Sequence, residues 1–356
     1  MCRHHLFAAC GLLFVLSTTS SAQTIDSVYR KSTAKPVAGE ITEVTKTDVT
    51  VTQKVGNKTE KIPANDILYI EWKGEPPALG LARSNERNGN YSQAVTGYQE
   101  ALAALEASNT RVKADITFSL ARTASKLAQS DPDQAASAIT QLKEFIAANR
   151  DFYRFFDAQM ILASTALQVN DAGTAEEAYT VLEQAPWTDY QMAGKIGNAE
   201  TLLARNDING AKAIFDQVAA MSTKSAAEKS RQLQAKLGQA ECLQRQNKQD
   251  EATTILNKVI EETTADDSRI NAEAYLRLGD GYVSQGQKNK EAVLAYLHVD
   301  VIPAFAAHSD LHAEALFRLF KLWPALNQPS RSADAAAKLE SDYPNSPWTK
   351  QLSGAN

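Results

Sequence analysis

Two histidines near the C-terminus, His308 and His312 in the stretch HSDLHAE, have the spacing of residues on one helix face. Imidazole nitrogens at positions i and i+4 can bind one metal ion, with Asp310 or Glu314 as a further carboxylate ligand. No cysteine stands nearby, and Ser309 or Asp310 is well suited to cap the helix that follows. The pattern therefore has two interpretations, a metal site or a solvent-exposed helix start, and we expect the second.

Residues for nucleophilic or acid–base catalysis do not form a known arrangement in this sequence. It contains no HExxH, GxSxG or GxGxxG motif and no phosphate-binding GxxxxGK[S/T] motif. Ala240 and Leu243 around Cys242 indicate a helix interior, so we expect a buried, unreactive thiol. The carboxylates of Glu261–Glu262 and Asp266–Asp267 could pair, but they are typical of a polar loop between helices. We therefore expect no catalytic activity, no cofactor and no metal ion.

The composition predicts a folded protein with little net surface charge. The chain has 356 residues, of which 44% are apolar and 22% charged, and its formal net charge is -5. Such a balance provides no large basic surface for nucleic acid or for an anionic membrane. We therefore expect a protein or peptide partner and no nucleic acid.

Residues 1–22 have the features of a secretory signal peptide. Arg3 precedes an apolar run over residues 6–16, and small residues at 20–22 suit cleavage after Ala22. The run is about half of the ~20 residues that a transmembrane helix needs, and no later stretch is long and apolar enough. We expect an exported protein, periplasmic or extracellular, without a transmembrane segment. Phe7–Cys10 could instead be a lipoprotein cleavage box, although few residues precede it.

Residues 23–73 are expected to form a small β-rich unit. The stretches VAGEITEV, DVTVTQKV and ILYIEW alternate with period two, and Gly56–Asn57 stands where a hairpin turn is needed. About five short strands cannot form a large sandwich, so a small, strongly bent barrel is expected. The hydrophobic spacing resembles that of Sm-like and SH3-like barrels. RNA-binding members of those families carry an Asp and an Asn in the loop after the second strand and a basic residue with Gly in a later loop. Here those loops are Thr45–Asp48 and Pro63–Ala64, which depart from that pattern. We therefore expect a docking or assembly module and not an RNA-binding ring.

After a predicted linker at residues 74–77, residues 78–352 have helical spacing and a repeated pattern. In each copy an alanine is followed four residues later by a larger apolar residue and three residues after that by another apolar residue. Successive alanines are 41, 40, 36, 41 and 40 residues apart, which predicts stacked helix pairs that bury a shared core. The six alanines are Ala94, Ala135, Ala175, Ala211, Ala252 and Ala292.

The repeat resembles the tetratricopeptide repeat family, most clearly in residues 275–296. There Tyr275, Leu278, Gly279, Tyr282, Gly286, Ala292 and Tyr296 match most of the family's marked positions, with one inserted residue. The period exceeds the family's usual 34 residues, which predicts extended helices. A seventh, divergent pair is expected over residues 311–347, with an ending similar to that of tetratricopeptide proteins of the bacterial envelope. The expected fold class is therefore α+β multidomain, a small N-terminal β-barrel followed by an all-α solenoid of about seven helix pairs.

The resemblance implies that the first helix of each pair lines a concave face, and that the residue after the glycine, or after its alanine substitute, points into it. In three repeats these residues are Glu200, Glu241 and Asp280, which could form an acidic stripe that selects a basic extended segment. The alternative is a solvated helix face without a binding role. We expect an exported, non-catalytic scaffold or adaptor that binds a protein or peptide. A self-associating structural subunit and an enzyme with an unrecognised site in the groove remain as alternatives.

Overall fold

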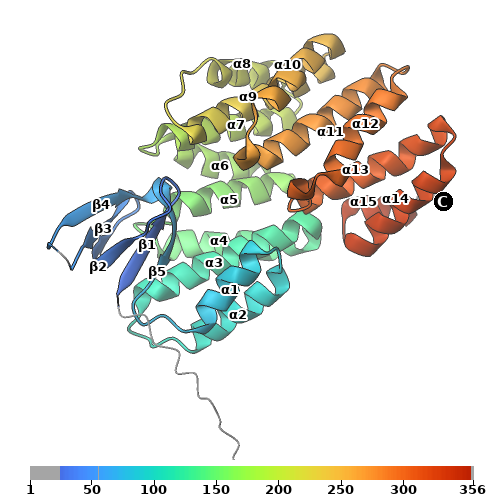
Figure 1. Cartoon of the computed structure of the whole chain (residues 1–356). Coiled ribbons are helices and arrows are strands. Elements are labelled where there is room, and N and C mark those ends of the chain that lie inside the picture. Colours follow the sequence, from blue (N-terminus) through green and yellow to red (C-terminus); the bar gives the residue numbers. More distant parts are fainter. Residues whose placement is uncertain (1–24, 55, 354–356) are drawn as a thin grey trace, which may run out of the picture.

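The computed structural model of the chain describes residues 25–54 and 56–353. The predicted signal peptide, with its cleavage after Ala22, lies outside the described residues. In the described part, five strands are followed by fourteen helices in seven consecutive pairs and by a short C-terminal helix (Figure 1). The expected order of a β unit followed by a helical solenoid is therefore confirmed.

The five strands form one antiparallel sheet in the order β4-β3-β2-β1-β5. Strand β2 changes partner along its length, because its first residues pair with β1 and its later residues pair with β3. Gly39 lies at this change, where an added Cβ would be 2.4 Å from the backbone oxygen of Thr52. The strands are β1 (Asp26–Arg30), β2 (Val37–Val44), β3 (Asp48–Thr52), β4 (Thr59–Pro63) and β5 (Ile67–Glu71).

The sheet is open, with β4 and β5 as its two edges, so the expected closure into a barrel is not seen. Two backbone carbonyls of β5 accept hydrogen bonds from guanidinium groups of the solenoid. Arg154 donates to the carbonyl of Leu68 at 2.7 Å, and Arg83 donates to that of Ile70 at 2.7 Å. Because side chains of the helices satisfy these groups, they are not available to another strand.

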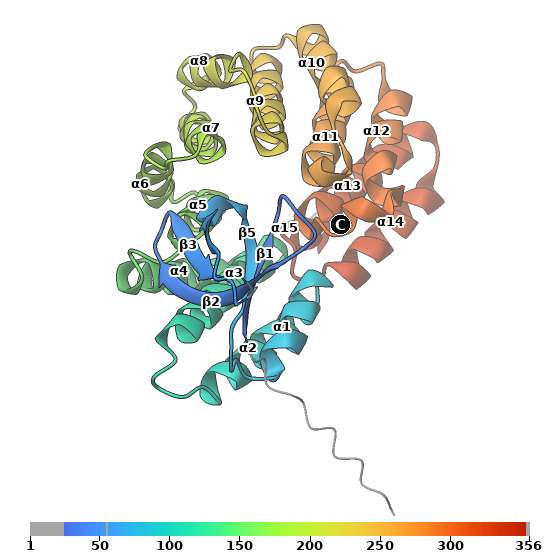
Figure 2. The same cartoon turned by 60° about the vertical axis from the view of Figure 1, so that its left-hand side comes forward.

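The helix pairs wind around a central space, and the first helix of each pair lies on the inner side (Figure 2). The C-terminal helices return to the start of the solenoid, where α13 packs against α3 and Lys350 lies 3.1 Å from the carboxylate of Asp133. No helix among the described residues is long and apolar enough to cross a membrane. The helices are α1 (Ala78–Arg87), α2 (Tyr91–Ala103), α3 (Thr110–Ser130), α4 (Ala135–Ala148), α5 (Phe155–Gln168), α6 (Ala172–Glu183), α7 (Thr188–Ala204), α8 (Ile208–Ala219), α9 (Ala226–Arg245), α10 (Gln249–Glu262), α11 (Ser268–Ser284), α12 (Asn289–Val301), α13 (Ser309–Leu322), α14 (Pro329–Asp342) and α15 (Pro347–Ser353).

The repeat pattern forms the core of the solenoid. All six alanines that define the repeat are completely buried. The larger residue four positions later packs against a small residue of a neighbouring helix: an added Cβ on Gly238 would be 2.4 Å from the ring of Phe215, and one on Gly279 would be 2.4 Å from Tyr296. Small residues at these crossings therefore let the helices approach each other closely.

The sheet and the first helices share one continuous core. Buried residues of both, such as Ile67 and Trp72 from the sheet and Phe118 from α3, belong to the same apolar cluster. The short connection between them, predicted as a linker, is held by a buried ion pair between Glu75 and Arg83, with a distance of 2.6 Å. The β unit is therefore packed against the solenoid and is not a separate unit on a flexible linker.

Candidate functional site

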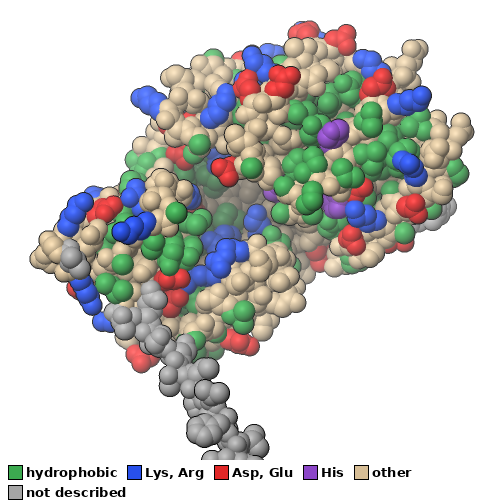
Figure 3. All heavy atoms as spheres, in the orientation of Figure 1, with side chains coloured by type: hydrophobic (Ala, Val, Ile, Leu, Met, Phe, Trp, Pro, Cys, Tyr) green, Lys and Arg blue, Asp and Glu red, His purple; other side chains and the backbone are tan. Residues whose placement is uncertain are grey.

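A cavity of about 600 Å³ lies on the inner side of the solenoid, between α5, α7, α9 and α11. The space-filling view shows the molecule hollowed at its centre, with lysine and arginine atoms visible in the recess (Figure 3). Three carboxylates and four guanidinium groups line the cavity, so it is not an acidic surface. They belong to Glu200, Glu241, Glu273, Arg231, Arg245, Arg269 and Arg277.

Glu241, predicted as part of an acidic stripe, lies in this cavity but is neutralised by two arginines. Its carboxylate accepts hydrogen bonds from Arg245 at 2.6 Å and from Arg277 at 2.5 Å. Arg277 also donates to Glu273 at 2.7 Å. These contacts hold the pKa of the Glu241 carboxyl below its ordinary value despite its burial, which opposes ionisation. The network therefore joins α9 to α11 and provides no free negative charge.

Glu200 lies in the same cavity but differs from Glu241 in its contacts. Among the described residues its carboxylate has no hydrogen-bond or ion-pair partner, and the side chain is partly buried. Removal from water, together with the negative charges of Glu273 and Glu241, raises the pKa of the Glu200 carboxyl to about 7. At neutral pH this group is therefore divided between its protonated and charged forms, and a nearby cation would favour the charged form.

Asp280, the third residue of the predicted stripe, does not line the cavity. It accepts a hydrogen bond from the hydroxyl of Tyr296 at 2.7 Å and lies 3.2 Å from the guanidinium of Arg318. The reason is the register of the repeat, because Glu200 and Glu241 are 41 residues apart whereas Asp280 follows after 39. Two residues correspond to about 200° of rotation around a helix, so Asp280 faces α12 and α13 instead.

Sequence reasoning missed the arginines that accompany these carboxylates. One signal was present, since Arg277 and Arg318 are also 41 residues apart, the step that separates Glu200 from Glu241. Arg231 and Arg245 carry no such signal. Arg231 donates to Gln234 on its own helix, and its other terminal nitrogen lies 3.3 Å from the sulfur of Met160 on α5, on the facing wall. Its place in the cavity depends on how the solenoid winds.

The histidines considered for metal binding have other roles. Both ring nitrogens of His312 are used, one with the hydroxyl of Tyr343 at 2.6 Å and one with Asp300 at 3.0 Å. His308 instead contacts Ser268 at 3.0 Å. No group of three potential ligands able to hold a metal ion occurs in the described ranges. The expected solvent-exposed helix start is also incorrect for His312, which is buried.

Cys242 is completely buried, as expected. Burial, with the negative charge of Glu241 beside it, raises the pKa of its thiol to about 11. The thiol therefore stays protonated at neutral pH and is a weak nucleophile.

Comparison with known proteins matches one helix pair of the solenoid to the tetratricopeptide repeat family. Residues 234–262, in α9 and α10, match the tetratricopeptide repeat family. A tetratricopeptide repeat protein from Parabacteroides merdae is 17% identical, with 74% of this chain and 91% of that chain covered and a TM-score of 0.48. A Rap protein complexed with competence and sporulation factor is 14% identical, covering 78% and 76% with a TM-score of 0.48. Pseudomonas aeruginosa pilF is 14% identical, covering 78% and 96% with a TM-score of 0.36. No curated protein matches the sequence.

Proposed function

We propose that this protein is a non-catalytic adaptor that binds an extended protein segment along the inner side of its solenoid. The observation that carries the proposal is the Glu200 carboxylate, which lines a cavity of about 600 Å³ without a direct partner among the described residues. A partly buried carboxylate without a direct ion pair costs stability, and such costs are typical of binding sites. A lysine, arginine or N-terminal ammonium of the partner would form the direct ion pair that Glu200 lacks among the described residues.

The arginines of the cavity extend this recognition to the rest of the segment. Arg231 and Arg269 reach the cavity from α9 and α11, and Arg245 lies on its rim with its side chain 40% exposed. Guanidinium groups donate several hydrogen bonds in a fixed geometry, so they suit the carbonyl groups of an extended backbone. The preferred ligand is therefore an extended segment with one cationic residue that reaches Glu200, and not a uniformly basic tail.

A binding experiment tests the proposal. The probes are fluorescein-labelled peptides of about ten residues, built from alternating Ser and Thr, with one central Lys or one central Glu. Residues 23–356 are titrated into each peptide, and binding is followed by fluorescence anisotropy. We expect tighter binding of the Lys peptide, and a loss of that preference in Glu200→Gln. Glu100→Gln on the exposed face of α2 is the matched control. Equal affinity for both peptides, or an unchanged preference in Glu200→Gln, would remove Glu200 as the anchor.

We also propose that the protein is exported, on the basis of the charged start, apolar run and small residues within residues 1–22. Fusing these residues to a reporter that is active only after export tests this. Replacement of Leu12 and Leu13 by Arg should abolish the reporter signal, because it interrupts the apolar run. Light scattering on residues 23–356 tests the remaining alternative, self-association.

A further inference from the structure

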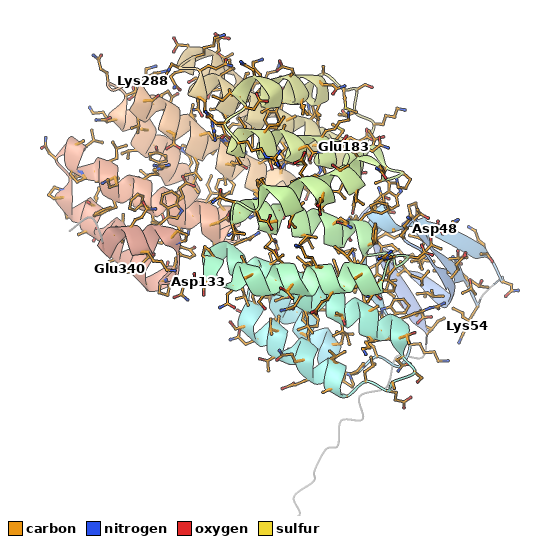
Figure 4. All side chains as sticks on the ribbon, turned by 180° about the vertical axis from the view of Figure 1, so that it is seen from behind. Asp48, Lys54, Asp133, Glu183, Lys288 and Glu340 are labelled. Atoms are coloured by element: carbon orange, nitrogen blue, oxygen red, sulfur yellow. The ribbon has the colours of Figure 1, made fainter. Side chains whose placement is uncertain are left out.

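A second groove lies on the outer side of the solenoid, between α4 and α6, with α5 as its floor. Its volume is about 670 Å³, and Lys46 of the β2–β3 turn lies at one end of it. Figure 4 views the molecule from behind, with the end of the sheet that carries Asp48 beside these helices. The groove is separate from the inner cavity, because α5 faces the cavity with Met160 and Ser164 and faces the groove with Phe155 and Leu162.

The walls of the groove are stripes along two helices. On α4 the lining residues are Lys143, Ile146 and Ala147, and on α6 they are Glu177, Ala178 and Val181. Spacings of three and four residues place each set on one helix face. Ala178 is buried in the core, whereas Ile146 and Val181 pack against the core and stay partly exposed in the groove. From Thr174 to Val181 on α6 the groove is two helical turns long, or about 10 Å at 1.5 Å per residue.

Positive charges stand at both ends of this apolar groove. At one end Lys143 bridges the two walls by donating to Thr174 at 3.0 Å. At the other end are Arg150 and Lys46, whose ammonium lies 5.7 Å from the ring centre of Phe155. Within the described part of the chain, no carboxylate forms an ion pair with Lys46, Lys143 or Arg150.

The sheet takes a direct part in the site. The backbone N–H of Lys46 donates to Asp151 at 3.0 Å, which fixes the β2–β3 turn against the segment between α4 and α5. Without the docked sheet the groove would lack one of its cations and one of its ends.

Gln159, in the floor of the groove, provides an independent indication of a ligand. The residue is only 7% exposed, yet its amide has no hydrogen-bond partner within residues 25–54 and 56–353. The amide atoms of Gln159 are not among the fully buried unsatisfied side-chain atoms of the described residues, so they face the groove, where a ligand can hydrogen-bond to them in place of water. The groove therefore offers apolar surface, an amide in its floor and a cation at each end.

We propose that this groove binds an amphipathic helix of a partner protein that carries apolar residues on one face and carboxylates on both flanks. Three helices line the groove over two turns, which is the geometry in which a further helix places side chains at i, i+3, i+4 and i+7. The three cations against one lining carboxylate, Glu177, select an acidic helix over a basic one. This proposal stands apart from the inner cavity and does not depend on Glu200.

The probe is a designed peptide of 15 residues, helical, with four leucines on one face, glutamates on the flanks and a fluorescein label. A matched peptide has lysine in place of every glutamate. Titration with residues 23–356 should show that the glutamate peptide binds about tenfold more tightly than the lysine peptide, because charge complementarity discriminates between otherwise equal partners. Equal binding of the two peptides, or no binding of either, would overturn the proposal.

Substitutions locate the binding. Lys143→Glu and Arg150→Glu change exposed side chains and should each weaken binding of the glutamate peptide about fivefold or more, whereas Lys258→Glu on α10 should have no effect. Glu200→Gln should leave this affinity unchanged, which separates this result from the test of the inner cavity. Unchanged binding in both groove variants would also overturn the proposal. Dodecanoate, a small amphiphile, is tested as an alternative ligand. If it binds and the glutamate peptide does not, the groove takes a small amphiphile and not a helix.

Discussion

The indole N–H of Trp72 donates to the buried carboxylate of Asp115 at 3.0 Å and so joins the end of the sheet to α3. The other oxygen of Asp115 accepts from the hydroxyl of Tyr153 at 2.6 Å. The guanidinium groups of Arg83 and Arg154 each lie 3.8 Å from this carboxylate. One acidic side chain therefore connects the end of the sheet, α1, α3 and the segment before α5.

Trp72→Phe tests this junction. The substitution removes the indole donor and keeps most of the ring, so we expect a loss of about 1–3 kcal/mol in the free energy of unfolding, from an unsatisfied buried acceptor. Urea denaturation measures it. Trp348→Phe is the control, since its indole forms no hydrogen bond among the described residues and its ring only packs against Phe317 and the guanidinium of Arg318. A loss no greater than that of the control would show that the hydrogen bond does not contribute.

Gly238→Ala tests the close approach of α8 to α9. The new methyl carbon would be 2.4 Å from the ring of Phe215, which is shorter than any normal contact. We expect a loss of about 1–3 kcal/mol from overpacking. Gly80→Ala in α1 is the matched control, because nothing lies within 4 Å of an added Cβ there. That variant should gain about 0.5–1 kcal/mol from the higher helix propensity of alanine. Thermal unfolding of the two variants should therefore give shifts of opposite sign.

Glu200→Gln should stabilise the protein in a pH-dependent way. The folded-state pKa of Glu200, about 7, lies above its ordinary value of 4.5, so the folded protein binds the proton more tightly than the unfolded chain does. Below about pH 4.5 the carboxyl is neutral in both states and the variant should match the wild type. As pH rises through 7 the wild type loses up to about 3 kcal/mol that the variant retains, at 1.36 kcal/mol per pKa unit. Urea titrations at pH 4, 6 and 8 measure the difference, and a constant difference would contradict the assignment.

Much of the fold could be predicted, because buried positions on helices and strands recur in the sequence with the period of the element. An alanine such as Ala252 or Ala292 is required where helices cross closely, and both are completely buried as expected. Period-two alternation likewise predicted the strands. The barrel prediction was wrong, because the sheet stays open and carbonyls of its β5 edge bind Arg83 and Arg154 of the solenoid in place of another strand. Such long-range partners leave no local pattern.

The candidate site was predicted only in part for a related reason. The position after the glycine, or after its alanine substitute, predicted Glu200, Glu241 and Asp280 as one stripe, but Asp280 follows Glu241 after 39 residues and not 41. A two-residue difference rotates a side chain to the far side of a helix. The winding of the solenoid, which determines whether Arg231 reaches the cavity, follows from the sum of many packing angles and has no sequence motif of its own.

Asp300→Asn should destabilise the protein with the opposite pH dependence from Glu200→Gln. The hydrogen bond from His312, followed by the charge and hydrogen bond of Lys338, holds the pKa of the Asp300 carboxyl below its ordinary value of 3.8. A lowered folded-state pKa means that the stabilisation is present above the unfolded-state value and is lost as the pH falls through the folded-state value.

We therefore expect Asp300→Asn to cost about 1–3 kcal/mol at pH 7, as for hydrogen bonds to charged groups, and less as the pH falls below 4. Asp334→Asn, on the exposed face of α14, is the control and should stay within about 0.5 kcal/mol of the wild type. Urea denaturation at pH 3 and pH 7 measures both variants. A cost that persists undiminished at pH 3 would mean that Asp300 acts by packing between α12 and α13 and not through its charge.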